Sequence, residues 1–348
     1  MANAGAAALG MLLLFDVFFG RPEQTAVETL KSVGGLPAHI AGRFEDIGAC
    51  QRSAAGDYFI FDRRAHAVYS VPASLEGPPK EIVGVGVEPG RLLRPSAFEL
   101  TPDGRFVIAD SPFGQPRVQF FLESGARVGG FTLPKSGMPQ VTLGSVVVSG
   151  VGSLEYNGRS IFISLPEFGA LITEYNSEGT LIRSFGELRA TGHEADRDVH
   201  LALNTGRIVI NPQGGFYYVF LAGAPLFRKY DARGALLFER HIQGGELDEY
   251  ARNRPTTWPK RSGANEIPLV MPVVRAAAAD AAGNLWISLA VPVTYVYDSA
   301  GERKRIVQFS AAGILTPTGL SFSRNGRLLA TPGCYAFETK DGRAGASR

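Results

Sequence analysis

The densest group of chemically active side chains lies in the segment 190–200, which reads ATGHEADRDVH. Imidazole and carboxylate groups bind divalent cations, and they exchange protons near neutral pH. The segment holds two of the chain's five histidines and three carboxylates within eight residues: His193, Glu194, Asp196, Asp198 and His200. These side chains are candidate metal ligands for calcium or zinc, or a candidate catalytic base.

The spacing within this segment favours a simpler interpretation. His193 and His200 are seven residues apart, whereas histidine ligand pairs on one helix face follow an i, i+4 pattern. Asp196 or Asp198 can pair locally with Arg197, and Asp198 can cap a short helix over 199–203. We therefore expect no cofactor, with a divalent cation as the alternative.

Two other segments carry cations beside aromatic or imidazole groups. The longest insertion, 244–271, contains RPTTWPKR, whose tryptophan between prolines and cations suits stacking or cation–π contact with a planar or anionic partner. The same tryptophan can instead seal apolar surface. The segment 62–66 is either a solvated turn or a basic lip. The candidate ligand-binding residues are Arg63, Arg64, His66, Arg197, Trp258, Lys260 and Arg261.

The remaining composition excludes several classes of protein. The net charge of +2 gives no reason to expect a nucleic-acid partner. There is no nucleophile elbow, phosphate loop, dinucleotide fingerprint or calcium loop of the helix-loop-helix type in the sequence. A glycine-rich stretch at 84–90 is not followed by a helical pattern. The elements that position the candidate residues must therefore be derived from the rest of the chain.

These elements follow from an internal repeat, seen most clearly in residues 96–133. A turn at Pro102-Asp-Gly104 precedes an apolar strand, and a second turn at Gly125 follows a third strand. The first turn glycine recurs at Gly56, Gly104, Gly158, Gly214, Gly283 and Gly326. The second recurs 18 to 21 residues later, at Gly77, Gly125, Gly179, Gly234 and Gly301. The pattern predicts two hairpins of fixed size in each unit, and thus small four-stranded antiparallel sheets.

Such sheets cannot bury both faces alone, so we expect them to stack radially into an all-β, six-bladed β-propeller. The last unit lacks a fourth strand, and the segment 39–43 is predicted to supply it and close the ring. The segment 24–33 is predicted as a short helix or linker. In a propeller, loops between second and third strands share one face with the connections between blades. We call this the connection face, and 62–66, 190–200 and 244–271 all belong to it.

The repeat resembles a known family at residues 106–121. The run Phe106-Val-Ile-Ala-Asp110, followed by Arg117-Val-Gln-Phe-Phe121, is similar to an NHL-type repeat of six-bladed propellers. The likeness spans 36–339 and is weaker in the other units. It implies the fold more strongly than a function, because such propellers include binding proteins as well as lyases and lactonases.

The predicted domains are a leader, anchor or linker at 1–35 and one propeller at 36–345 with the insertion at 244–271. The apolar run 6–20 is a signal peptide whose start lies upstream, a membrane tether, or a helix packed on the propeller. The first two interpretations are preferred and predict a periplasmic or extracytoplasmic protein, whereas the third predicts a cytoplasmic one.

The two cysteines, Cys50 and Cys334, lie in the first and last units. A disulfide across the ring closure is conceivable, but two reduced core cysteines are the favoured expectation.

The functional prediction that follows is a non-catalytic propeller that binds a protein, peptide or glycan on the connection face. The alternative is a metal-dependent lyase or lactonase-like hydrolase at the His193–His200 loop. A channel-bound cation would need carboxylate or amide ligands from several blades. The evenly distributed set of one such ligand per blade is not seen; Glu155, Asn211 and Asp280 come near first strands, with their register undetermined.

Overall fold

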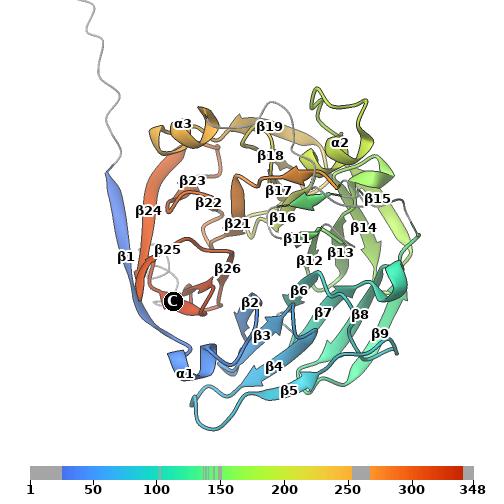
Figure 1. The fold of residues 1–348 in the computed structure, drawn as a ribbon, viewed down its shortest axis with the longest axis vertical. Coiled ribbons are helices and arrows are strands. Elements are labelled where there is room, and N and C mark those ends of the chain that lie inside the picture. The colour runs from blue at the N-terminus through green and yellow to red at the C-terminus, as the bar shows by residue number, and fades with distance from the viewer. Residues whose placement is uncertain are drawn as a thin grey trace, which may run out of the picture.

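A computed structural model describes residues 26–339 except for 102, 136, 138, 140, 144–145, 148–150 and 253–266. Six blades, each of four strands, surround a central axis, and Figure 1 shows them in a view down that axis. This is the six-bladed β-propeller that the repeat predicts. Each blade runs from an inner first strand to an outer fourth strand.

The first three blades alternate strand and tight turn, as predicted. Blade 1 consists of β2 (Ile47–Arg52), β3 (Tyr58–Asp62), β4 (Ala67–Val71) and β5 (Lys80–Val83). Blade 2 consists of β6 (Ala97–Leu100), β7 (Arg105–Asp110), β8 (Arg117–Leu122) and β9 (Arg127–Thr132). Blade 3 consists of β12 (Ser153–Tyr156), β13 (Ser160–Ser164), β14 (Ile172–Asn176) and β15 (Leu181–Phe185).

The last three blades continue the pattern, except that the sixth borrows its outer strand from the N-terminal segment. Blade 4 consists of β16 (Gly206–Ile210), β17 (Phe216–Phe220), β18 (Leu226–Tyr230) and β19 (Leu236–His241). Blade 5 consists of β21 (Val274–Ala279), β22 (Leu285–Leu289), β23 (Thr294–Tyr297) and β24 (Arg303–Ala311), which also pairs with β25 (Gly313–Leu315). Blade 6 consists of β26 (Gly319–Phe322), β27 (Leu328–Thr331), β28 (Tyr335–Phe337) and β1 (Val27–Gly35).

The turn glycines behave as the repeat predicts. Gly104 and Gly125 have φ of +78° and +87°, in the left-handed region that residues with a Cβ rarely adopt. A Cβ on Gly125 would also collide with the carbonyl of Ile82 in the preceding blade. Glycine is therefore required at this turn both by its backbone conformation and by the closeness of the next blade.

The hydrophobic core is divided into one cluster for each space between neighbouring blades. Between blades 1 and 2, the ring of Phe106 stacks on Phe121 with centroids 5.1 Å apart and lies 6.0 Å from Phe59. All three rings are buried. Truncating such a ring to alanine costs about 3 to 5 kcal/mol, so the contacts between blades hold the ring of sheets together.

The N-terminal strand closes the ring, but not through the predicted residues. The segment 39–43, predicted as the closing strand, instead contains the one-turn helix α1 (Ala38–Ala41), which follows Pro37. The closing strand is β1, which includes the described part of the segment predicted as a helix or linker. Residues 27–35 therefore belong to the propeller.

Strand β1 joins two blades. Its first half, Val27 to Lys31, pairs in parallel with β24, and its second half pairs antiparallel with β28. Blades 5 and 6 are consequently joined into one nine-stranded sheet, and Figure 1 shows β1 alongside β24. The backbone groups at the outer edge of blade 5 are thus satisfied by a segment almost 300 residues away in sequence.

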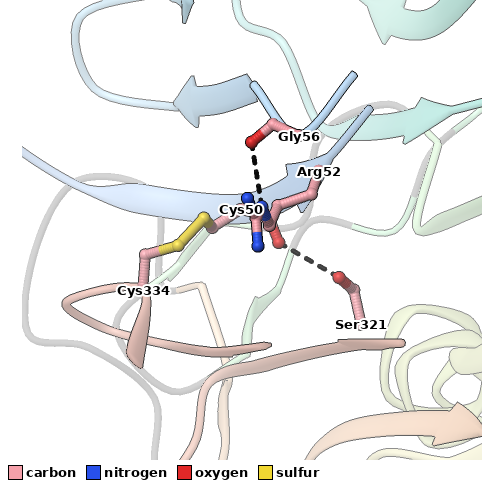
Figure 2. Close-up of a disulfide and its surroundings, with 5 residues drawn as sticks. All are labelled: Cys50, Arg52, Gly56, Ser321 and Cys334. Atoms are coloured by element: carbon pink, nitrogen blue, oxygen red, sulfur yellow. Dashed lines mark hydrogen bonds between the residues drawn. A yellow bond between two sulfur atoms is a disulfide. The ribbon is translucent and has the colours of Figure 1, made fainter. Parts of the chain in front are cut away.

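The cysteines correct a second expectation. Cys50 in β2 and Cys334 in the loop between β27 and β28 form a disulfide, with their Cα atoms 5.8 Å apart. Figure 2 shows this bridge beside a hydrogen bond from Ser321 Oγ to the carbonyl of Cys50. Ring closure brings the first and last units together, which the sequence spacing does not fix. The disulfide therefore adds a covalent link to the contact between blades 1 and 6.

A cap covers part of the connection face over blades 3 to 5. It contains α2 (Arg197–Leu203) and a small sheet formed by β11 (Val146–Val147), β10 (Thr142–Leu143) and β20 (Leu269–Val270). Val141, Val199 and Val270 share a separate buried cluster beneath it. Three connections that are distant in sequence thus form one structural unit.

The other short elements are η1 (Pro112–Gly114), η2 (Pro166–Phe168) and α3 (Gly245–Arg252). Among the described residues, no helix combines the length and apolar character needed for a membrane crossing. The apolar run 6–20 lies outside the described residues.

Candidate functional site in the central channel

The inner strands of all six blades line a cavity of about 80 Å³ in the central channel. Most of its wall is made of small or apolar residues, such as Gly48, Ala276 and Gly319. Four side chains with strong hydrogen-bonding or ionic character interrupt this wall: Gln51, Glu99, Glu155 and Arg207. The polar part of the channel is therefore concentrated on blades 1 to 4.

The first three of these side chains occupy equivalent positions in consecutive blades. Gln51 is paired with Phe59, Glu99 with Val107, and Glu155 with Phe162. In each blade the partner is the second residue of the equivalent apolar run. The repeat therefore places an amide and two carboxyl groups at one level around the axis.

Gln51 connects two blades through its amide. Its Nε2 donates to Glu99 Oε2 at 3.0 Å, and its Oε1 accepts from the backbone N–H of Leu100 at 2.6 Å. The amide orientation is consistent with both contacts, because each of its ends then meets a group of opposite hydrogen-bonding type. Glu99 is thereby held in a fixed position on the channel wall.

Burial changes the protonation of both carboxyl groups. It raises the pKa of Glu99 to about 7, against the weaker opposing effect of the Gln51 hydrogen bond. Burial, followed by the negative charge of Glu99, also raises the pKa of Glu155 well above its ordinary value. Two neighbouring carboxyl groups in a narrow channel disfavour a second negative charge. At neutral pH the pair therefore carries fewer than two negative charges.

Arg207 enters the same channel from β16, across from Val219 in β17. Its Nε is buried and has no hydrogen-bond partner among the described residues. Burial and then the positive charge of Arg63 lower the pKa of Arg207, whereas Glu155 opposes this shift. Glu155 therefore acts on Arg207 at a distance: within the described residues, Arg207 forms no ion pair.

The predicted residue Arg63 lies near this channel. Its guanidinium pairs with Asp46 at 3.0 Å, and its side chain occupies the space above Gly48 that a Cβ would fill. The loop 62–66 is held by the buried carboxylate of Asp62, which accepts backbone N–H bonds from Glu45 and Asp46 and from two loop residues. The predicted basic segment 62–66 is thus a turn whose backbone is held in place by the carboxylate of Asp62.

The other predicted residues of this loop differ in exposure. Arg64 is exposed, and its backbone N–H bonds to Asp62. His66 is partly buried and has a φ of 54°, so the loop ends in a left-handed residue. Of the three basic candidates in the loop, only Arg63 is near enough to the channel to shift the pKa of Arg207.

The candidate metal loop is organised by contacts within itself. Glu194 Oε1 accepts from the backbone N–H groups of Thr191 and Gly192 at 2.7 and 3.1 Å, and these bonds lower the pKa of Glu194. His200 Nδ1 lies 2.8 Å from Thr191 Oγ1 and 3.9 Å from Glu194 Oε1. His193 donates its backbone N–H to the same Thr191 hydroxyl. Thr191 is thus a shared contact of His193 and His200 in this loop.

The remaining side chains of this loop fix α2. Asp196, not the predicted Asp198, is the N-cap, and its carboxylate accepts from Val199 N at 3.2 Å. Arg197 lies 3.5 Å from Asp198 and donates to the carbonyl of Gly137 at 2.6 Å. Among the described residues, no group of three or more histidine, cysteine, aspartate or glutamate side chains is arranged to hold a metal.

The insertion 244–271 is described only at its two ends. At the first end, α3 is tied to blade 5 by a 2.5 Å hydrogen bond from Tyr295 to Glu246. At the second end, β20 joins the cap sheet. The predicted contacts of Trp258, Lys260 and Arg261 lie outside the described residues.

The structure therefore brings together a different set of residues from the one predicted. Gln51, Glu99 and Arg207 were missed, and Glu155 was noted without its register. Asn211 and Asp280 were singled out together with Glu155. Both accept backbone hydrogen bonds in the turns that follow the inner strands. A usable signal was available: Gln51 and Glu99 each lie five residues before their first turn glycine, Gly56 and Gly104.

Comparison with known proteins supports the fold. No family model and no curated protein sequence matches the chain. A solved streptogramin B lyase has a TM-score of 0.51 at 11% identity, covering 83% of this chain and 76% of that one. A Staphylococcus aureus virginiamycin B lyase has a TM-score of 0.49 at 12% identity, and the match covers 84% of this chain and 80% of the lyase. A Xanthomonas campestris gluconolactonase has a TM-score of 0.49 at 14% identity, and the match covers 91% of this chain and 98% of the gluconolactonase. The likeness to the streptogramin B lyase shows the propeller fold alone, because at 11% identity it says nothing about activity.

Proposed function

We propose that this chain is a non-catalytic binding propeller whose ligand lies on the connection face, over 62–66, 190–200 and 244–271. The ligand class we propose is a protein, a peptide or a glycan. The main support is the unequal construction of the two faces. The hairpin face, opposite the connection face, carries tight turns such as those at Gly104 and Gly125, whereas the connection face carries the cap.

The cap is suited to recognition because it is anchored. The apolar side of α2 is buried, and Arg197 ties α2 to the carbonyl of Gly137 in another connection. The parallel pairing of β10 with β20 links two more connections. Rigid presentation of loops lowers the entropy lost on binding, and long connections in compact folds are commonly functional.

The second proposal, a metal-dependent lyase or lactonase-like hydrolase at the His193–His200 loop, has less support. Glu194 and His200 already bond to neighbouring loop atoms, so a metal would have to displace these contacts. The loop also lies on the surface, where water screens charges and weakens electrostatic catalysis.

The binding proposal is tested by screening the purified chain against a printed glycan array and a phage-displayed peptide library. We expect a selected glycan or peptide to lose at least about tenfold in affinity with Arg64→Ser plus Arg197→Ser, a loss typical of a few ionic contacts. Arg233→Ser is the matched control, because Arg233 is exposed in a hairpin-face turn. Equal loss in the control, or no selected ligand, would contradict the proposal.

A further inference from the structure

Arg207 is the least satisfied charged group in the part of the channel that the structure describes. Its Nε is buried and has no hydrogen-bond partner among the described residues, and the partly exposed side chain lines the cavity. A buried cation without a counter-charge is strongly unfavourable in a protein interior, and such groups are normally paired. The position is therefore suited to an anionic partner that enters the cavity.

The carboxyl groups of the channel do not supply this counter-charge. Neither Glu99 nor Glu155 forms an ion pair with Arg207 within the described residues, and Glu99 is held by Gln51. The nearby carboxylate of Asp46 is already paired with Arg63. Burial favours the protonated form of both channel carboxyl groups. The cavity in that state has one uncompensated positive charge and two acid groups that can donate hydrogen bonds.

We propose that the channel cavity binds a small free monocarboxylate of about the size of acetate, with Arg207 as its ion-pair partner and the carboxyl groups of Glu99 and Glu155 beside it. This site is distinct from the ligand surface proposed on the connection face. A guanidinium and a carboxylate have matching planar geometry and form charge-assisted hydrogen bonds.

The size and charge of the cavity limit the ligand. A cavity of about 150 Å³ accepts benzene, so one of about 80 Å³ takes only a few non-hydrogen atoms. A single net positive charge matches a monoanion better than a divalent anion. A cation is disfavoured because Arg207 would repel it at short range within the cavity.

The test is titration of the full chain with acetate, followed by saturation-transfer NMR and calorimetry at constant ionic strength and about pH 6. A ligand of this size has limited affinity, so we expect a dissociation constant on the order of 1 mM. Arg207→Gln should weaken acetate binding at least about tenfold, as loss of a buried ion pair does. Arg233→Gln, which removes the same charge at an exposed turn, should leave it unchanged.

Several outcomes would overturn this proposal. These are no acetate binding by the unmodified chain, equal binding by Arg207→Gln, and loss of binding in Arg233→Gln. An acetylated aspartyl peptide that binds through Arg207 while acetate does not would assign the site to a peptide side chain, and would overturn the free ligand. Loss of array ligands with retained acetate binding would contradict only the connection-face proposal.

Discussion

The His193–His200 loop and the central channel place similar chemical groups in opposite physical settings. In the loop, two histidines and three carboxylates are close in sequence, and Glu194 and His200 are satisfied by Thr191 and its neighbours. In the channel, the side chains of Gln51, Glu99, Glu155 and Arg207 come from four blades and line one cavity, and Arg207 Nε has no hydrogen-bond partner among the described residues. The ionisable residues of the loop are close together in the sequence, whereas those of the channel are close together only in the folded chain.

The difference shows why proximity in sequence is a weak indicator of a site. Neighbouring polar residues on an exposed loop can satisfy one another and the backbone, and water screens what remains. Groups that converge from separate strands on a narrow channel are only partly exposed, so water screens their charges less than it does on a loop. Their charges therefore shift the pKa of each neighbour, as Glu99 does for Glu155.

The largest expected effect is on the pH dependence of stability. The pKa of Glu99 is about 7 in the folded chain, above its ordinary 4.5, so its stabilising contribution is complete below 4.5 and is lost as pH rises through 7. Chemical denaturation should show a loss of about 2 kcal/mol between about pH 5 and pH 8 from this group. Glu99→Gln should remove most of that slope.

The matched control for this measurement is Glu194→Gln in the loop. The pKa of Glu194 is lowered by backbone hydrogen bonds, and its side chain is exposed. Its contribution has the opposite sign, being lost as pH falls, and it should be too small to alter the slope between neutral and alkaline pH. An unchanged slope in Glu99→Gln would remove the distinction between the two regions.

The second effect concerns the buried cation. At about pH 6, where protonation of the channel carboxyl groups is favoured, Arg207→Gln should raise stability by about 1 to 2 kcal/mol in the absence of acetate, because an unpaired charge leaves the interior. Arg197→Gln removes an exposed charge from the loop and should not stabilise the chain. Thermal denaturation measures both variants, and destabilisation by Arg207→Gln would show that the guanidinium is paired.

The third effect is a difference in stability between two aspartate variants of the loop, which tests whether Asp196 or Asp198 supports α2. Asp196→Ala removes the N-cap of α2 and should cost about 1 kcal/mol, whereas Asp198→Ala should cost less than about 0.5 kcal/mol. Urea denaturation resolves this difference. A larger loss for Asp198 would mean that it, and not Asp196, supports the helix.

The smallest expected effect is in metal content. Because Glu194 and His200 have partners within the loop, elemental analysis of the purified chain should show no stoichiometric calcium or zinc. His193→Ala and His200→Ala should then leave the metal content unchanged. Stoichiometric metal that disappears in either variant would support the enzyme proposal and would reverse the comparison between the loop and the channel.

Much of the fold could be predicted because the repeat is local. The turn glycines Gly104 and Gly125, with the apolar runs between them, specify two hairpins without reference to the rest of the chain. The closing strand was predicted in the wrong place because β1 pairs with residues about 300 positions away, and its own sequence is a weak strand pattern. The disulfide depended on the same long-range closure.

The candidate site could be predicted only in part. Glu155 was recognised as lying near an inner strand, but its direction depends on register, and a shift of one residue would point it away from the channel. Arg207 carries no local signal, because an arginine in a strand is ordinarily a solvated surface residue. Its isolation becomes visible only when the six inner strands surround it.

The sequence by itself determined the unit of this protein: a four-stranded sheet bounded by glycine turns and repeated until it must stack on copies of itself. Local backbone preferences and apolar patterning suffice for that. The tertiary structure alone decided which strand closes the ring, whether the two cysteines meet and which four side chains share the central channel. These outcomes depend on distances between residues far apart in the chain, and ring closure sets those distances.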